Sequence, residues 1–325
     1  MNVLITSASR KVALVRAFQD AVRRILPEGR VIAVDANACA PALYRADAGY
    51  VIPRTDSSHF LSFIIEFCSN HDIKLVIPTR DEELPFFAEH NEIFLRQGIR
   101  VMIASGDVIR RCLDKSSFLR FCTDHGFTIP KIWVTRDWSN PEIYPVFLRP
   151  SSGKGGRGAR KVNSQSELNA FIDNPKEILV QEYVDAPEYT VDLFADFSGK
   201  VISAVPRRRL HVWGGESFVT ATENNAEIIQ ESVRLANEMG LVGQNTIQCF
   251  LRDGKPLFIE INPRFGGAAN LSIRAGADSP SYLLRLMRGE TLESCLGQFT
   301  NHLTMLRFVE DTFLLPDELI QSSAP

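Results

Sequence analysis

The first third of the chain alternates short apolar runs with amphipathic stretches. A β-rich apolar run is followed by turn residues at 7–9, and apolar residues then recur at helical spacing over 12–26. Because further apolar runs alternate with helical stretches, we predict a parallel, doubly wound α/β sheet over about residues 1–105. Its predicted strands span 2–6, 31–34, 75–77 and 101–103.

The pattern changes from about Asp114 onward. Strand-like runs now follow one another across short turns such as Ser198-Gly199, which reads as a hairpin. The second part of the chain is therefore predicted to be an α+β unit rich in antiparallel pairs. The predicted helices span 115–125 and 226–239, the predicted strands span 131–134, 146–148, 178–184, 190–196 and 201–205, and a last hairpin covers 246–261.

Charge and composition argue against several classes of protein. The 325 residues carry 36 lysines plus arginines against 39 acidic residues, a formal net charge of -3 that gives no long-range attraction to nucleic acid or anionic membranes. The first apolar run is too short for a secretion signal, and no stretch approaches the roughly 20 apolar residues that span a bilayer. The six cysteines lack the spacing of a zinc site. We expect a cytoplasmic protein that binds neither nucleic acid nor membranes.

The first predicted strand, loop and helix leave a nucleotide-binding role open. Asp35 ends the second strand, where an acidic residue could meet a ribose hydroxyl, although it could equally cap a helix or form a turn. The first loop, TSASRK over 6–11, lacks the G-x-G-x-x-G that lets a pyrophosphate approach a helix N-terminus. This loop argues against a dinucleotide enzyme.

A glycine-rich segment, RPSSGKGGRG over 149–158, follows a predicted strand directly. Its glycines let backbone N–H groups converge on phosphate oxygens, and its three cations offset phosphate charge. No G-K-[ST] closes the segment, so it is not a Walker A loop. It is a candidate phosphate loop, and a mobile surface hairpin is the alternative.

A second group of polar residues lies on the last predicted hairpin. Glu260 and Asn262 are two positions apart, so a strand puts both on one face, and Gln248 could meet them from the partner strand. Oxygen ligands of this kind suit Mg²⁺ that is shared with nucleotide phosphates. Arg264 would extend toward the same anions. Solvated strand residues are the alternative for any one of them, but the set predicts a magnesium site.

The order of these motifs resembles the ATP-grasp superfamily. The chain presents in turn D-K at 114–115, R-P-x-x-G-x-G-G-x-G at 149–158, Q-E-Y-V at 181–184, E-Y-T-V-D at 188–192 and E-I-N-P-R at 260–264. Within that superfamily they are most similar to short, single-unit relatives of the carbamoyl-phosphate synthase large subunit. The resemblance covers about residues 1–290, and it implies that the α+β part is a two-lobed ATP-grasp fold.

The resemblance implies a role for each motif residue. Glu182 and Val184 would line the adenine pocket, Glu188 would hold the ribose hydroxyls, and Arg264 would stabilise the transferring phosphoryl group. The implied ATP-binding residues are Lys115, Arg149, Ser152, Gly153, Lys154, Gly155, Gly156, Gln181, Glu182, Tyr183, Val184 and Glu188. The implied ligands of Mg²⁺, with Mn²⁺ as the alternative ion, are Gln248, Glu260 and Asn262.

Two departures from the family pattern bear on function. Arg149 stands where many members have lysine, and an arginine can grip a phosphate bidentately. The carbamoyl-phosphate synthase branch shares that arginine. The chain also contains one ATP unit and no duplicated half, which argues against carbamoyl phosphate synthesis itself.

Substrate-binding candidates lie in four further segments. In strand geometry Arg207 and Arg209 share a face, so they could cradle a carboxylate or acyl phosphate, with solvated charge as the alternative. We favour Arg209, as a catalytic residue. The acidic run that follows the strand near Ile77 could recognise an amine or could complement a helix dipole. The remaining substrate candidates are Ser9, Arg10, Asp81, Glu82, Arg207 and Arg274.

Together these patterns predict an ATP-dependent, ADP-forming ligase that activates a small-molecule carboxylate as an acyl phosphate for capture by an amine. A small-molecule kinase and a MgATP sensor without turnover are the alternatives. The oligomeric state is open, with a homodimer as one option. We expect a Rossmann-like pre-ATP-grasp domain over 1–110, a small lobe over 111–187, and a C-terminal lobe with the magnesium site over 188–325.

Overall fold

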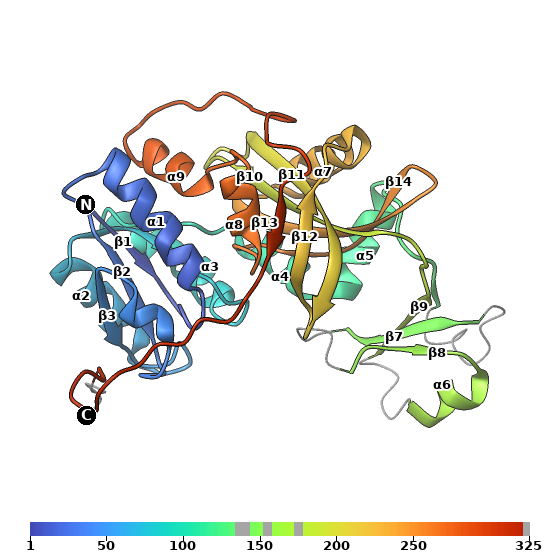
Figure 1. Ribbon diagram of the computed structural model, residues 1–325, viewed down its shortest axis with the longest axis horizontal. Helices are drawn as coiled ribbons and strands as arrows, with labels where there is room; N and C mark the ends of the chain where they lie inside the picture. Colours follow the sequence, from blue (N-terminus) through green and yellow to red (C-terminus); the bar gives the residue numbers. More distant parts are fainter. Residues whose placement is uncertain (134–143, 152–157, 172–177, 321–325) are drawn as a thin grey trace.

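The computed structural model describes residues 1–133, 144–151, 158–171 and 178–320, and these residues form three β-sheets. In Figure 1 a five-stranded sheet lies at the left, a six-stranded sheet in the middle and a four-stranded sheet at the lower right. The sheets fall within the predicted ranges 1–110, 188–325 and 111–187, while the exact domain boundaries stay a prediction.

The N-terminal sheet is parallel, as predicted, with the strand order β3-β2-β1-β4-β5. This order reverses direction at β1, so the carboxyl ends of β1 and β4 lie at a topological switch point, where open α/β sheets bind ligands. Its strands are β1 (Asn2–Ile5), β2 (Val31–Asp35), β3 (Ala48–Val51), β4 (Ile73–Ile77) and β5 (Arg100–Val101).

Strand β3 escaped prediction because its short run AGYV carries a glycine where a strand normally carries a side chain to pack. A Cβ atom on Gly49 would lie 2.2 Å from the carbonyl oxygen of Leu43. Glycine therefore lets the 3₁₀ turn η1 (Pro41–Tyr44) pack directly on the edge of the sheet.

Helices cover both faces of this sheet because alternate residues of β1 point to opposite layers. Val3 and Ile5 pack with α1 (Val12–Ile25), whereas Leu4 packs with the other layer. Two helices that follow β14 in the chain return to the α1 layer, so a late part of the chain completes the N-terminal core. The other covering helices are α2 (Phe60–Asn70), α3 (Leu84–Arg96) and α4 (Gly106–Leu113), and the returning pair are α8 (Ala269–Arg274) and α9 (Ser279–Met287).

The six-stranded sheet is antiparallel, in the order β14-β13-β10-β11-β12-β15. Helix α7 (Ala226–Met239) and helix α5 (Lys115–Asp124) pack against it, and one continuous hydrophobic core joins it to the N-terminal sheet. Its strands are β10 (Glu188–Ala195), β11 (Val201–Trp213), β12 (Glu216–Thr222), β13 (Gly243–Arg252), β14 (Lys255–Asn262) and β15 (Thr304–Leu306).

The small sheet is also antiparallel, in the order β6-β9-β7-β8, and has its own core around Trp133, Val146 and Val180. With the parallel sheet before it and the six-stranded sheet after it, this arrangement confirms the predicted fold class. Its elements are β6 (Ile132–Trp133), β7 (Val146–Pro150), β8 (Arg160–Val162), α6 (Gln165–Phe171) and β9 (Ile178–Glu182). Throughout the described ranges, every helix is too short or too polar to cross a membrane.

The sequence placed the end of β11 too early, at residue 205, because three arginines follow there. The strand continues because Arg207 points inward and donates from Nε to Asp192 Oδ2 at 2.8 Å. Ser272 on α8 donates to the same oxygen at 2.6 Å. Both charged side chains are at most 3% exposed, so this is a buried ion pair with a supporting hydroxyl.

Replacing Arg207 with leucine is expected to lower the free energy of unfolding by about 3–5 kcal/mol, because Asp192 would stay buried without its cation. Arg208→Leu, at the exposed neighbouring position, is the matched control and should change stability by no more than about 0.5 kcal/mol. Urea denaturation followed by circular dichroism measures both. Equal losses in the two variants would contradict the structural role of the pair.

Candidate active site

Charged and amide side chains from all three parts of the fold meet between the N-terminal and six-stranded sheets. We call this group the charged cluster. Helix α5, strands β7, β10, β11, β13 and β14, and the loop after β4 each supply at least one member. Its members are Asp81, Lys115, Arg149, Glu188, Arg209, Gln248, Glu260, Asn262 and Arg264.

Glu260 on β14 lies at the centre of the cluster. Lys115 Nζ and Arg149 Nη1 each lie 3.8 Å from its Oε2 atom. Burial lowers the pKa of both cations, and the nearby Glu260 carboxylate opposes that shift. Two largely buried cations therefore share one carboxylate, and the excess positive charge makes this end of the site suitable for phosphate groups.

Local structure explains why Lys115 points at Glu260. Asp114 caps α5 by accepting a hydrogen bond from the Ser117 backbone N–H at 2.8 Å, which makes Lys115 the first helical residue. The Lys115 backbone N–H donates to the Ser151 carbonyl at 3.2 Å, so the helix start is tied to the end of β7. Arg149 is fixed from the other side, because its Nη2 donates to the Ile259 carbonyl at 3.1 Å.

Gln248, Arg209 and Glu188 extend the cluster along the sheet. Gln248 pairs with Glu260 in the register of β13 and β14. With its amide oriented to satisfy both neighbours, its nitrogen donates to Glu260 Oε1 at 3.1 Å and its oxygen accepts from Arg209 Nη1 at 3.0 Å. Arg209 Nη1 also lies 3.4 Å from Glu188 Oε1. Burial raises the pKa of Glu188, and Arg209 opposes the rise.

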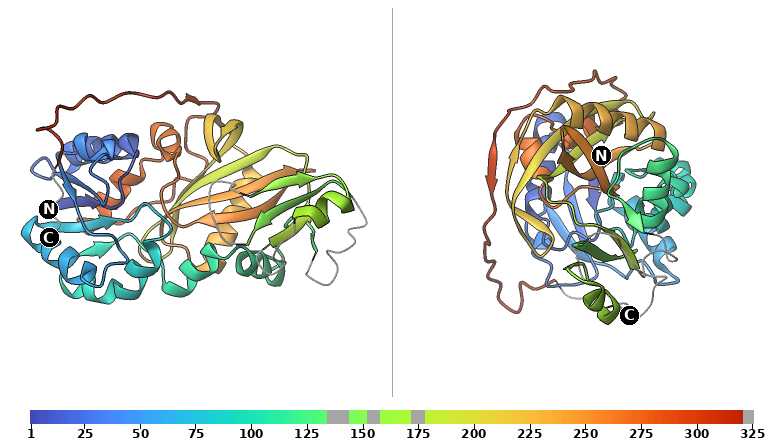
Figure 2. Two further views of the ribbon diagram at one scale, coloured as in Figure 1. Left: turned by 90° about the horizontal axis from the view of Figure 1, so that it is seen from below. Right: turned by 90° about the vertical axis from the view of Figure 1, so that its right-hand side faces the viewer.

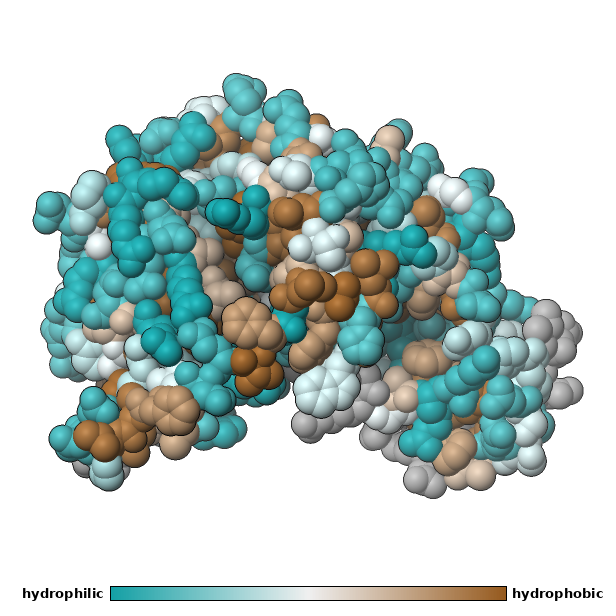
Figure 3. Space-filling view, viewed as in Figure 1, coloured by the Kyte–Doolittle hydropathy of each residue, from teal (hydrophilic) through white to brown (hydrophobic). Residues whose placement is uncertain are grey.

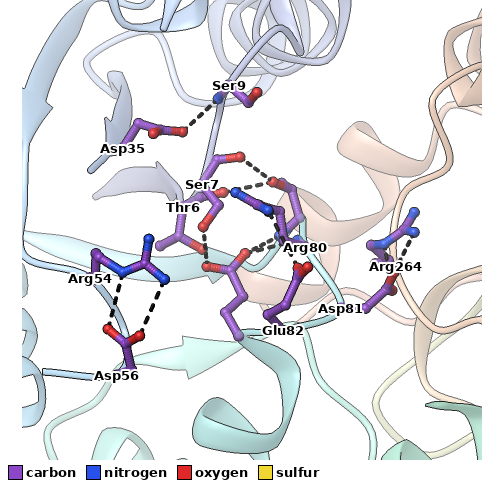
Figure 4. Close-up of polar contacts among 12 residues, drawn as sticks. Thr6, Ser7, Ser9, Asp35, Arg54, Asp56, Arg80, Asp81, Glu82 and Arg264 are labelled. Atoms are coloured by element: carbon purple, nitrogen blue, oxygen red, sulfur yellow. Dashed lines mark hydrogen bonds and ion pairs between the residues drawn. The ribbon is translucent and has the colours of Figure 1, made fainter. Parts of the chain in front are cut away.

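Arg264 links the cluster to the N-terminal domain. Its Nε and Nη2 atoms donate to the two carboxylate oxygens of Asp81 at 2.7 and 2.8 Å, a bidentate pair drawn in Figure 4. Nη2 also donates to Asn262 Oδ1 at 3.3 Å, and Asn262 lies 3.4 Å from Glu260 through its own amide nitrogen. The chain of contacts thus runs unbroken from Asp81 to Glu260.

The side chains of the cluster offer mainly oxygen atoms to the implied magnesium ion. In the described ranges no three His, Cys, Asp or Glu side chains gather as a metal site, so the protein would supply one carboxylate and amide oxygens. Mg²⁺ held jointly with nucleotide phosphates needs only one or two carboxylates, so Glu260 fits it. Asn262 and Gln248 fit only if their amides turn, because the amide nitrogen of each faces Glu260.

The loops after β1 and β4 are tied together at the switch point, as Figure 4 shows. Glu83 is fully buried and accepts hydrogen bonds from Ser7 Oγ at 2.8 Å and from the Thr79 backbone N–H at 2.6 Å. Asp35 accepts from the Ser9 backbone N–H at 2.9 Å, so its carboxylate holds the loop. Ser7 and Ser9 have φ values of 46° and 47°, a strained conformation that the hydrogen bonds maintain.

The structure brings only some of the predicted substrate residues to the cluster. Asp81 is there as the partner of Arg264, whereas Glu82 lies 3.3 Å from Arg80. These carboxylates and Glu83 all have partners within the protein, and an amine-binding role for the acidic run stays a prediction. The side chain of Arg207 is only 3% exposed and pairs with Asp192, which leaves it no surface to offer a substrate.

Arg10 and Arg274 are exposed. They lie on the loop after β1 and at the end of α8, and neither takes part in the contacts that define the charged cluster. Both stay predictions as substrate residues.

The predicted adenine-binding segment lies where β9 ends and the chain passes to β10. Gln181 and Val184 are buried, and Tyr183 is half-exposed beneath Lys161, whose Nζ lies 4.1 Å from the ring centroid. Glu182 accepts a hydrogen bond from the Lys131 backbone N–H at 3.2 Å and pairs with Arg252 at 3.0 Å. The predicted loop residues Ser152, Gly153, Lys154, Gly155 and Gly156 lie outside the described ranges.

Sequence reasoning missed Thr79, and it named Lys11 and Glu83 only as members of their loops, without the contacts that the structure shows. The Lys11 ammonium donates to the Ser7 carbonyl at 3.2 Å, and burial lowers its pKa to about 8, with the positive charge of Arg264 adding to the effect. The acidic run 81–83 was the signal for Glu83, but the sequence could not show that the third carboxylate turns inward.

The lowered pKa of Lys11 predicts a pH-dependent stability. Because the unfolded chain binds this proton up to about pH 10.5 and the folded chain only up to about pH 8, burial of the charge destabilises the fold below pH 8. Lys11→Met is expected to be more stable than the natural protein below pH 8, and the difference should shrink as the pH rises toward 10.5. Urea midpoints at pH 7 and 9.5 measure it.

Lys255→Met, at an exposed turn, is the control and should show no such trend. A difference for Lys11→Met that does not vary between these two pH values would contradict the shifted pKa.

Two family models match the chain in separate segments. Residues 3–102 match the PylC-like N-terminal domain, and residues 174–306 match the family described as ATP-grasp in the biosynthetic pathway with Ter operon. Together with the three-sheet architecture, these matches confirm the predicted resemblance to the ATP-grasp superfamily. Carbamoyl phosphate synthase large chains are among its sequence relatives.

Two of these relatives show the extent of the similarity. The large chain of Gemmatimonas aurantiaca is 26% identical over 217 residues, which is 60% of this chain and 20% of that protein. The arginine-specific large chain of Geobacillus stearothermophilus is 28% identical over 177 residues, 51% of this chain and 17% of that protein. The chain therefore spans about a fifth of the length of the relatives it matches.

Solved structures share the fold at low sequence identity. The biotin carboxylase–beta-gamma-ATP complex of Campylobacter jejuni has a TM-score of 0.72 at 18% identity, covering 90% of this chain and 72% of that chain. The ADP complex of N5-carboxyaminoimidazole ribonucleotide synthetase has a TM-score of 0.71 at 16% sequence identity, covering 94% of this chain and 81% of that chain. The L-amino acid ligase of Bacillus licheniformis has a TM-score of 0.68 at 17% sequence identity, covering 88% of this chain and 74% of that chain. These likenesses show the fold.

Proposed function

We propose that the protein is an ADP-forming, ATP-dependent ligase that activates a small-molecule carboxylate as an acyl phosphate and joins it to an amine. One observation carries the proposal: Glu260 lies between two cations, Lys115 and Arg149, each 3.8 Å away, and connects through Asn262 to Arg264. A carboxylate for a metal and three cations for phosphate oxygens are what phosphoryl transfer needs.

In the proposed reaction a substrate carboxylate oxygen attacks the γ-phosphorus, and the bond from that phosphorus to ADP breaks. An amine then attacks the acyl carbon, loses a proton, and expels phosphate that carries the former carboxylate oxygen. Lys115 and Arg149 would hold the phosphates of ATP, and Arg264 would neutralise charge on the transferring group. Bound Mg²⁺, held by Glu260 and Asn262, would supply charge neutralisation between the phosphates.

The comparisons support this chemistry without naming the substrate. One solved relative is a carboxylase bound to MgADP, ADP and bicarbonate, another is a ribonucleotide synthetase bound to ADP, and a third is an amino acid ligase. For this chain we propose ATP, Mg²⁺ and a carboxylate of unspecified structure. The segment 111–187 would form the lobe over the nucleotide, and the enzyme would work in the cytoplasm, where MgATP is supplied.

Arg209 is proposed as the group that meets the carboxylate. Its Nη2 donates to the Gly215 carbonyl at 2.9 Å and its Nη1 lies between Gln248 and Glu188. Burial lowers the pKa of this guanidinium because little water solvates its charge. A bound carboxylate would stabilise the charge in place of that water. Glu188 would then be free to meet the ribose hydroxyls, as the resemblance implies.

The test is ATP consumption against pools of amino acids and other small carboxylates, with and without amines, with products identified by mass spectrometry. We expect carboxylate-dependent ADP release and a condensed product. A stable phosphorylated product instead would support a small-molecule kinase. Binding of MgATP without turnover in every pool would support a nucleotide sensor.

A further inference from the structure

A late segment of the chain crosses from the six-stranded sheet to the N-terminal domain. We call residues 304–320 the C-terminal strap. It begins as β15, which pairs with β12, and Figure 2 shows the tail then running toward the N-terminal domain. Glu310 pairs with Arg16 on α1 at 3.2 Å, and the Ile320 backbone N–H donates to the Tyr44 hydroxyl at 3.2 Å. The strap is therefore fastened to both parts of the fold.

Arg307 points from the strap toward the protein. Exposure alternates along this segment, because Met305 and Arg307 are half-buried whereas Leu306 and Phe308 are exposed, and Figure 3 shows hydrophobic residues along the outer course of the strap. The Arg307 backbone N–H donates to the Phe218 carbonyl at 2.8 Å. Pairing with β12 therefore fixes the point from which the guanidinium extends inward.

The Arg307 guanidinium joins two loops beside the charged cluster. It pairs with Glu216 on the β11–β12 hairpin and donates to the Gly267 carbonyl, in the loop that follows β14 and carries Arg264. The two loops approach closely there, since a Cβ atom on Gly267 would lie 3.3 Å from Glu216 Oε2. One side chain of the strap thus clamps the hairpin to the loop that carries Arg264.

Arg209 and Arg264 are also connected through the charged cluster. The side chains that connect them are Gln248, Glu260 and Asn262. These three are the implied ligands of Mg²⁺, so binding of MgATP would exchange the contacts between them. The two guanidiniums would then lose the contacts that fix their spacing at the moment when the reaction needs it.

The clamp supplies a second connection, which passes through residues outside the implied ATP-binding and metal-binding sets. Arg209 Nη2 donates to the Gly215 carbonyl at 2.9 Å, and the next residue is Glu216, the partner of Arg307. From Arg307 the connection continues to the loop after β14. Because nucleotide and metal would not compete for these contacts, the contacts can hold the two guanidiniums in place while those of the cluster are exchanged.

We propose that Arg307 is a positioning residue of the ligase, an inference that rests on the proposed function. It holds the β11–β12 hairpin and the loop after β14 at the spacing that lets Arg209 and Arg264 act on one substrate. Reacting groups must be held to within about 0.5 Å, so loss of the clamp should slow the reaction without preventing nucleotide binding. Since Glu216 is 51% exposed, its pair with Arg307 adds little to the stability of the fold.

Steady-state kinetics of Arg307→Met tests the positioning role. The turnover number should fall by at least about tenfold, while the KM for ATP stays within about twofold and the urea midpoint is unchanged. Glu216→Gln releases the same guanidinium, so its loss should be similar, and the double variant should be no slower. Arg16→Met is the matched control, because it removes the arginine that holds the strap at Glu310, and it should keep the natural turnover number.

Hydrogen–deuterium exchange tests the clamp independently of turnover. In Arg307→Met the backbone amides of 213–218 and 264–268 should exchange at least about fivefold faster than in the natural protein, and in Arg16→Met they should not. Faster exchange in a protein that turns over no carboxylate in any pool would support the clamp and count against the proposed function, so the two failures can be told apart.

Three results would overturn the positioning role. The first is natural turnover and natural exchange in both Arg307→Met and Glu216→Gln. The second is a loss of turnover that Arg16→Met shares, because the strap as a whole would then be needed. The third is slower turnover with unchanged exchange, because Arg307 would then act on the substrate directly and not through the two loops.

Discussion

Glu260→Gln is expected to lower the turnover number of the proposed ligase by about 10²–10³-fold without unfolding the protein. The substitution keeps the shape of the side chain but removes the carboxylate that Lys115 and Arg149 share, each at 3.8 Å. It also removes the only carboxylate among the predicted metal ligands, so the Mg²⁺ concentration that gives half-maximal activity should rise. ADP release at saturating ATP, measured across a Mg²⁺ titration, tests both effects.

Glu293→Gln, at a side chain that is 92% exposed, is the control for Glu260→Gln and should leave both quantities unchanged. Activity and magnesium dependence that stay at the natural level in Glu260→Gln would contradict the metal assignment. If Glu260→Gln lost activity but kept the magnesium dependence of the natural protein, Glu260 would act as the partner of Lys115 and Arg149 and not as a metal ligand.

Arg264→Ala is expected to lower turnover by about 10²–10³-fold, because the guanidinium would face charge that develops on the transferring phosphoryl group. Asp81 acts through this arginine, which it holds in a bidentate pair at 2.7 and 2.8 Å. Asp81→Asn should therefore cost about tenfold, mostly in turnover number rather than in the KM for ATP. The double variant should be no slower than Arg264→Ala alone.

Steady-state kinetics of the two single variants and the double variant measure this coupling. Asp56→Asn, at an exposed carboxylate on the neighbouring loop drawn in Figure 4, is the control and should behave as the natural protein does. Additive losses from Asp81 and Arg264 would show that the two residues act independently, and would refute a positioning role for Asp81.

Local patterns were enough to predict the parallel sheet and most of the antiparallel strands. The run VIAVD of β2 is buried at every position, which is the pattern of a parallel strand covered on both faces. Gln248 and Glu260 could be placed on facing strands in advance because one tight turn joins β13 and β14, although a register shift between Gln248 and Cys249 sets their direct pairing. Predictions of this kind depend on residues that are close in the sequence.

The features that could not be predicted from the sequence depend on contacts between distant parts of the chain. Asp81 and Arg264 are 183 positions apart and meet only because α8 and α9 return to the N-terminal layer. The inward turn of Arg207 depends on Asp192 in a neighbouring strand, whereas the run of three arginines alone predicted an anion cradle, with solvated charge as the alternative. Strand β15 has only three residues and forms through antiparallel pairing with β12.

Most charged groups of the cluster also contact one another, with one positive charge in excess. Glu260 faces Lys115, Arg149 and Gln248, while Arg209 faces Glu188 and Gln248. Binding of MgATP would exchange these internal contacts for contacts with phosphates and metal. We therefore expect binding to reorganise side chains on strands whose backbone is already in register.

Isotope transfer tests the acyl phosphate most directly. A carboxylate that stimulates ADP release would be supplied with ¹⁸O in both carboxyl oxygens, together with the amine that completes the reaction, and the released phosphate would be analysed by mass spectrometry. Activation of the carboxylate predicts one ¹⁸O atom in each phosphate, because the attacking oxygen leaves with phosphorus. Phosphate without the label would show that the carboxylate is not phosphorylated, and would contradict the proposed function.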